Sequence, residues 1–144
     1  MAAQQTYANH VRYFPLVHFV IVPLLLIVLI WNAVLLYQAP SWTQAFVLLF
    51  CIIVGLVNLA ARLQALRVQD RVIRNEERLR YKELLSPEIA ARASDLPIGR
   101  IIALRFASDG ELAEMVLQVL DGKLNSSKEI KMAVKNWRGD YLRV

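Results

Sequence analysis

The feature that most constrains this chain is a run of 49 residues, 13–61, that carries no formal charge if His18 is neutral. Arg12 and Arg62 flank it. The hydrocarbon core of a bilayer is about 30 Å thick, and a helix of about 20 apolar residues crosses it. The run is therefore long enough for two passes and a tight turn. A conventional soluble fold is excluded, and the sequence predicts two membrane spans.

The first apolar segment is not expected to be a cleaved secretory signal. Such a signal combines a basic start, an apolar run of about 7–15 residues and a small-residue cleavage site. Residues 16–36 form a longer run, and no A-x-A pattern follows it. We therefore interpret this segment as a retained span.

A short turn divides the uncharged run. Pro40 disfavours helix directly before it, and Ser41 and Gln44 have the spacing of a helix-capping box. Spans of about 16–36 and 42–61 are therefore predicted to form an antiparallel transmembrane hairpin. Residues 13–61 make up this unit, and residues 1–12 form a polar N-terminal lead.

The second span is predicted to continue as a cytoplasmic stalk over residues 62–86. No proline occurs between Trp42 and Pro87, and the segment after the span is rich in good helix formers. Acidic and basic side chains also recur four residues apart, which stabilises a helix. These predicted pairs are Asp70 with Arg74 and Glu76 with Arg80.

Positive charge is concentrated directly after the second span. Residues 62–86 carry +3 of the total of +5, whereas the turn between the spans is uncharged. The positive-inside rule therefore predicts that both termini face the cytoplasm. Arg62 and Arg67 lie nearest to the membrane and are expected to contact lipid headgroups. Arg74 and Arg78 are expected to be solvated.

An apolar seam on the stalk is too polar for a convincing coiled coil. Asp70 and Glu77 occupy two of its places. Its apolar members are Leu59, Leu63, Leu66 and Ile73. A long self-associating stalk is therefore not predicted from this seam.

Residues 87–144 are predicted to form a small bundle of short amphipathic helices. Their apolar residues recur at helical spacing, and no segment has the alternation of a strand. Two capping boxes, Ser108 with Glu111 and Ser126 with Glu129, mark helix starts. The apolar faces comprise Ile98, Ile101, Ile102 and Phe106; Leu112, Met115, Val116, Val119 and Leu120; and Ile130, Ala133, Val134 and Trp137. A region of this size is expected to lean on another surface.

The last of these helices is expected to carry a basic face opposite its apolar face. A basic helix with a tryptophan can lie on an anionic membrane or bind nucleic acid, whereas in a bundle its lysines would simply be solvated. Nucleic acid is not predicted, because residues 87–144 carry a net charge of only +1. The candidate docking or membrane-surface residues are Lys128, Lys131, Lys135, Trp137 and Arg138.

A few polar or small residues interrupt the apolar spans, namely His18, Asn32, Gly55 and Asn58. The asparagines and the glycine suit close helix packing, and the polar side chains would line a pore if several copies assembled. His18 would bond a neighbouring carbonyl or relay protons, and a weaker alternative is haem binding through His10 or His18. Pro23 follows in the same span, where a bend is expected.

An enzyme is not predicted. Cys51 is the only cysteine and lies inside the apolar run, and the histidines are His10 and His18. No spacing matches a metal cluster, a phosphate loop or a nucleophile elbow. The sequence therefore predicts no catalytic residue, metal site, cofactor or small-molecule substrate.

Three motifs carry a family resemblance. They are residues 9–19 (NHVRYFPLVHF), residues 67–80 (RVQDRVIRNEERLR) and residues 104–112 (LRFASDGEL). The chain resembles, over nearly its whole length, an uncharacterised bacterial family of small two-span membrane proteins classed as a domain of unknown function. The resemblance implies a bacterial inner membrane and a two-span layout, and it implies no activity or ligand.

The function expected from these observations is that of a non-catalytic interaction protein or accessory subunit. The hairpin would anchor it in the lipid bilayer, and the stalk and bundle would dock onto a second copy or a larger membrane complex. The alternative is a homo-oligomeric pore lined by the two spans.

Overall fold

The computed structural model describes residues 5–10 and 13–141 of the chain. These residues form one π-helical segment and six α-helices, and they contain no strand. The predicted all-helical fold is therefore confirmed for the described residues. The chain divides into two compact units, a hairpin over residues 12–66 and a second, small unit that combines residues 1–11 with residues 67–143.

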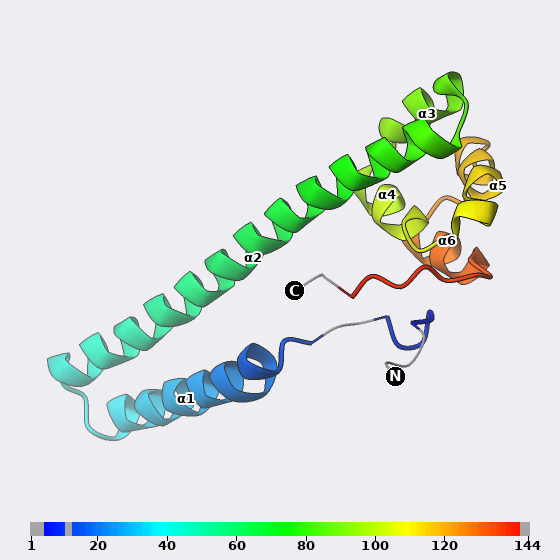
Figure 1. The fold of residues 1–144 in the computed structure, drawn as a ribbon. Coiled ribbons are helices and arrows are strands. Elements are labelled where there is room, and N and C mark those ends of the chain that lie inside the picture. The colour runs from blue at the N-terminus through cyan, green and yellow to red at the C-terminus, as the bar shows by residue number, and fades with distance from the viewer. Residues whose placement is uncertain (1–4, 11–12, 142–144) are drawn as a thin grey trace. The chain divides into compact units, whose positions relative to one another are not determined.

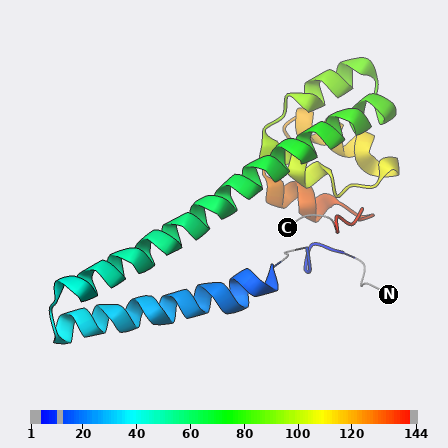
Figure 2. The ribbon, with the colours of Figure 1, turned by 60° about the vertical axis from the view of Figure 1, so that its left-hand side comes forward.

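The hairpin unit consists of a π-helical segment, Leu16–Ile21, followed by α1, Val22–Gln38, and the first part of α2, Trp42–Leu84. Figures 1 and 2 show α1 lying alongside the beginning of α2. The most apolar windows of both long helices are only 6% buried within the protein, so their apolar side chains face outward. Both helices are long and apolar enough to cross a membrane, which favours a membrane location.

The first helix widens directly before Pro23. The amide of Val22 donates to the carbonyl of Val17, five residues back, and this bond closes a π-helical turn. A proline cannot donate a backbone hydrogen bond and its ring crowds the preceding turn, so the wider turn accommodates it. The structure thus places a local widening where the sequence predicted a bend.

The turn between the helices uses half of the predicted capping box. The Ser41 Oγ accepts from the Gln44 amide at 3.2 Å. The Gln44 side chain, however, donates through Nε2 to Asn32 Oδ1 at 2.6 Å. Gln44 therefore joins the two helices and does not return to the start of its own helix.

Four short helices lie against one side of the end of α2 in the second unit, as Figures 1 and 2 show. They are α3, Pro87–Ser94; α4, Ile98–Leu104; α5, Asp109–Leu120; and α6, Ser127–Ala133. The predicted apolar faces meet in one core. Its largest fully buried side chains include Tyr81, Phe106, Ile101, Leu104, Leu112 and Ile130.

Both predicted capping boxes of this unit are confirmed. The Ser126 Oγ accepts from the Glu129 amide at 3.1 Å, and Glu129 Oε2 accepts from the Asn125 amide at 2.8 Å. These backbone amides, of Asn125 first and of Ser126 next, hold the pKa of Glu129 below its usual value. The caps explain why α5 and α6 begin where they do.

The last helix is shorter than predicted, because α6 ends at Ala133. The chain then pairs in antiparallel fashion with the segment before α5. The Ser108 amide donates to the Asn136 carbonyl at 3.1 Å, and the Arg138 amide donates to the Phe106 carbonyl at 2.8 Å. This pairing replaces helical hydrogen bonds, so the prediction of one basic helical face reaching Arg138 is wrong.

The N-terminal lead contributes to the same unit. Gln5 is buried, and its Oε1 accepts from the Asp140 amide at 2.8 Å. The His10 ring lies against Phe106 and Trp137, with ring centroids 6.1 and 6.0 Å away. Residues 5–10 and the end of α2 therefore supply the surface against which the short helices pack. The sequence alone did not identify this surface.

Candidate functional site: a buried charge network beside a cavity

Arg80, on the last turns of α2, is the centre of a charge network. Arg80 and Glu77 are buried in it, whereas the side chains of Asp109 and Arg138 are 67% and 53% exposed. The Arg80 side chain is 8% exposed. The Nε donates to Asp109 Oδ1 at 2.8 Å, and Nη2 donates to the Ala107 carbonyl at 2.7 Å. The Nη1 donates to Glu77 Oε2 at 3.2 Å. One guanidinium group thus fixes the start of α5 against α2.

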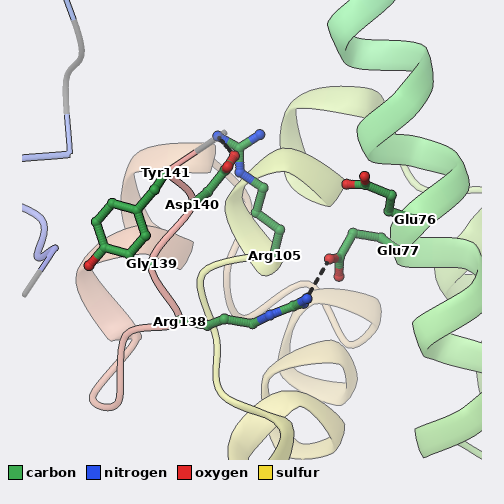
Figure 3. A pocket seen from close by; sticks show the side chains of 7 residues that line it. All are labelled: Glu76, Glu77, Arg105, Arg138, Gly139, Asp140 and Tyr141. Atoms are coloured by element: carbon green, nitrogen blue, oxygen red, sulfur yellow. Dashed lines mark hydrogen bonds and ion pairs between the residues drawn. The ribbon is translucent and has the colours of Figure 1, made fainter. Parts of the chain in front are cut away.

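Glu77 accepts from two arginines. Its second oxygen, Oε1, lies 3.4 Å from Nη1 of Arg138, which belongs to the last segment of the chain (Figure 3). The Glu77 side chain is 5% exposed. Burial raises the pKa of this carboxyl above its usual value, while Arg80 and then Arg138 oppose the shift.

A second buried arginine extends the network on the other side of the cavity. Arg105 Nη2 lies 3.2 Å from Asp140 Oδ2, and the Arg105 side chain is 5% exposed. Its guanidinium also lies over the Phe106 ring, 4.6 Å from the centroid. Planar guanidinium groups suit both kinds of contact. Through these contacts, Arg105 and Arg138 hold the C-terminal segment against the rest of the small unit.

A cavity of about 560 Å³ opens between these charges, as Figure 3 shows. Carboxylates from α2 and arginines from the rest of the unit face each other across it. Its lining consists of Glu76, Glu77, Arg105, Arg138, Gly139, Asp140 and Tyr141. Groups of this kind recognise polar and charged partners by charge-assisted hydrogen bonds. Such a lining suits polar or charged groups.

Tyr81 lies fully buried next to the network, one residue after Arg80. Within the described residues its hydroxyl has no hydrogen-bond partner. Burial, and then the negative charge of Glu77, raise the pKa of Tyr81 strongly. The phenol therefore stays protonated at neutral pH and acts as a large core side chain.

The polar residues predicted in the spans take different positions. The amide of Asn32 joins α1 to α2 through Gln44, and Gly55 faces α1 closely enough that an added Cβ would lie 3.4 Å from Leu25 Cδ2. Asn58 is half-buried on α2. The His18 Nδ1 lies 3.0 Å from the Phe14 carbonyl, within the π-helical region. The structure thus brings Asn32 into the hairpin interface but does not gather the four residues at one site.

The predicted headgroup residues Arg62 and Arg67 both lie on α2, with Arg62 half-buried and Arg67 exposed. Arg67 lines a shallow cavity of about 270 Å³ with Asp70, Arg71, Arg74 and Ile98. Positive charge therefore gathers on the helix directly after its apolar part, as a lipid contact requires.

The predicted basic face on the last helix is dispersed. Only Lys128 and Lys131 lie on α6. The Lys131 Nζ lies 3.3 Å from His10 Nε2, and Trp137 stacks near Phe106 at 4.8 Å between centroids. Lys135 and Arg138 follow the helix, and Arg138 belongs to the charge network. These five residues therefore do not form one surface.

The sequence reasoning missed the charge network and predicted a different partner for Arg80. It paired Arg80 with Glu76, four residues back, whereas the structure pairs it with Glu77, three residues back. One signal was present: Glu77, like Asp70, occupies a place in a seam whose other members are apolar, and a charge on such a face indicates burial with a partner. The remaining partners lie 27 and 29 positions away along the chain, beyond the reach of local spacing.

Comparison with known proteins bears on the family alone. No curated protein and no solved structure matches the chain. The model of one family, described as a family of unknown function (DUF6526), matches residues 1–144. The chain therefore belongs to this family of unknown function.

Proposed function

We propose that the chain is a non-catalytic accessory subunit, anchored in a bacterial inner membrane with both termini in the cytoplasm. In this proposal the hairpin is the anchor, and the small helical unit is presented to a larger membrane complex or to a second copy. Lipid headgroups would contact Arg62 and Arg67.

The observation that carries the proposal is the double role of α2. Its first half is apolar and outward-facing, with Cys51 and Gly55 in the hairpin interface. Its last turns supply Glu77, Arg80 and Tyr81 to the interior of the small helical unit. An anchor and a folded recognition unit therefore share one continuous helix, Trp42–Leu84.

The charge network supports a recognition role for the small unit. Its arginines and carboxylates are paired with each other, so they stabilise a fixed surface, and the cavity beside them is lined by charged groups. Charged and polar rims of this kind favour specific orientation of a partner.

The test is co-purification from gently solubilised membranes. A tagged full chain, extracted in native lipid, is expected to elute with partner proteins or as an oligomer. Met132, 62% exposed on α6, offers a perturbing variant, Met132→Glu, which should reduce recovery of partners that bind the small unit. Ala113→Glu adds the same charge at an exposed position on α5 and is the matched control. A chain that elutes only as an unpartnered monomer would contradict the proposal.

A pore is the second candidate, and Asn58 is the observation that favours it. This polar side chain lies in the apolar half of α2 and makes no hydrogen bond to another described residue. The Asn32–Gln44 bond supports packing instead at the other end of the hairpin. Ion flux in liposomes that is abolished by Asn58→Leu would favour the pore, and an absence of flux would leave the accessory role.

A further inference from the structure

The face of α2 that points away from the short helices of the small unit carries an exposed apolar stripe. Ile73 and Tyr81 are buried on the inner face, whereas Val68, Val72 and Leu79 are 60%, 49% and 62% exposed. The stripe differs from the seam through Ile73, which Asp70 and Glu77 interrupt. We call Ala65, Val68, Val72, Asn75 and Leu79 the outer seam.

The outer seam has the spacing of a coiled-coil contact. Its members follow one another at intervals of three, four, three and four residues on a continuous helix. Leu79 lies 18 residues beyond Ala61, which is ~27 Å along a helix, so lipid would not cover it. Asn75 is the one polar member, and a parallel pair in register places the two Asn75 side chains opposite each other, where they can bond to one another.

The charges that flank the outer seam complement an identical helix. In a parallel coiled coil, Ala65, Val72 and Leu79 take the a positions. The residue directly before an a position then faces the residue five places later on the partner helix. Arg71 then faces Glu76, and Arg78 and Glu83 repeat the same relation one heptad on. Arg71, Glu76 and Glu83 are exposed, whereas Arg78 is half-buried and donates to the Ser94 carbonyl. An antiparallel pair would instead place arginine against arginine and glutamate against glutamate.

We propose that the outer seam binds the outer seam of a second copy, in parallel and in register. This inference rests on the proposed function, because copies inserted in one membrane share their orientation and can meet only side by side in parallel. Membrane anchoring also raises the effective concentration of the two helices, so a short contact suffices. The occupant of the exposed stripe is therefore this chain itself.

Cysteine cross-linking in native membranes tests the contact. In a Cys51→Ser background, Val68→Cys lies in the outer seam, and Arg67→Cys is an exposed neighbour about 100° around the helix. Oxidation is expected to yield several-fold more covalent dimer from Val68→Cys than from Arg67→Cys. Equal dimer from both variants, or none from Val68→Cys, overturns the proposal.

Charge reversal tests the register. Arg71→Glu alone and Glu76→Arg alone should each reduce the Val68 cross-link, because each places like charges opposite one another. Mixing the two variants should restore it between unlike chains. If both single reversals cross-link as well as the parent chain, the parallel register is overturned. If the cross-link is absent but other membrane proteins still co-purify, this inference fails and the proposed function stands.

Discussion

At the scale of single residues, Glu77, Arg80 and Tyr81 place a pair of charges directly beside a fully buried aromatic core side chain. The Arg80 guanidinium donates hydrogen bonds to Glu77, Asp109 and the Ala107 carbonyl. A buried charge is tolerated when its partners remain, and it is costly when one of them is removed. The network therefore stabilises the small unit through the completeness of its pairing.

Replacing Arg80 by methionine removes the centre of the network and leaves Glu77 buried without its nearest partner. We expect Arg80→Met to lower the free energy of unfolding of the small unit by about 3–5 kcal/mol. Hydrogen exchange of α5 amides in the full chain would measure this loss. Lys82→Met is the control, since Lys82 is exposed on the same helix and should change the value little.

Tyr81 is expected to behave in the opposite way. Its hydroxyl is buried without a described partner, so Tyr81→Phe removes an unpaired polar group and keeps the ring. The free energy of unfolding should stay unchanged or rise by about 1 kcal/mol. The same exchange measurement applies, and a clear fall in stability would reveal a partner for the hydroxyl.

The raised pKa of Glu77 gives the small unit a pH dependence. Because folding disfavours the charged carboxylate, the contribution of Glu77 to stability is largest below the ordinary value of 4.5. It falls as pH rises from there through the higher pKa of the folded state. The free energy of unfolding of the parent chain should therefore fall relative to that of Glu77→Gln as pH rises. A difference that moves the other way would contradict a raised pKa.

At the scale of elements, Glu111 links the start of α5 to the chain that follows α6. Its carboxylate accepts from the amides of Ser108, Lys135 and Asn136 at 3.2, 3.2 and 3.1 Å. The cap of α6, in contrast, is local and is confined to residues 125–129. One acidic residue thus serves as a helix cap and as a clasp between segments.

This difference predicts a ranking of two cap variants. Ser126→Ala removes a local cap and should cost about 1 kcal/mol. Glu111→Ala removes the charged acceptor of the Lys135 and Asn136 amides, while the Ser108 amide keeps its bond to the Asn136 carbonyl. Because hydrogen bonds to a charged group are the stronger ones, it should cost more, about 2–3 kcal/mol. Exchange of the Lys135 and Asn136 amides should accelerate only in Glu111→Ala. Equal costs for the two variants would show that the clasp contributes nothing.

The elements show which parts of the structure are predictable from local pattern. The caps at Ser108 and Ser126 follow from spacing within one turn, and the confirmed helix starts depend on little else. The end of α6 at Ala133 does not, because it is decided by pairing with Phe106 and Ser108, far back in the chain. Gln44 fails as a cap residue for the same reason, since Asn32 on the other helix competes for its amide.

At the scale of the whole molecule, the proposed orientation makes a prediction for the hairpin turn. In a Cys51→Ser background, Ala39→Cys should react with a membrane-impermeant maleimide added to intact cells. Lys128→Cys, exposed on α6, should react only after the inner membrane is opened. Labelling of both positions from outside, or the reverse order, would contradict cytoplasmic termini.

Distant contacts explain what the sequence does not reveal at this scale. The two long apolar helices can be predicted from the uncharged run, because that prediction depends only on the length and composition of the run. The charge network joins α2 with Asp109 and Arg138, and neither partner is within helical reach of Arg80 or Glu77. The contacts of residues 5–10 with the small unit are equally invisible to periodicity.

The bond between Gln5 and the Asp140 amide joins residues 135 positions apart. It also sets an order of events during synthesis. Chains fold progressively from the N-terminus as they leave the ribosome. Residues 5–10 emerge before both apolar helices, yet the surface that receives them, at Lys131, Trp137 and Asp140, is made after those helices. Both apolar helices are synthesised in the interval, so the small unit can be completed only after the hairpin has been made.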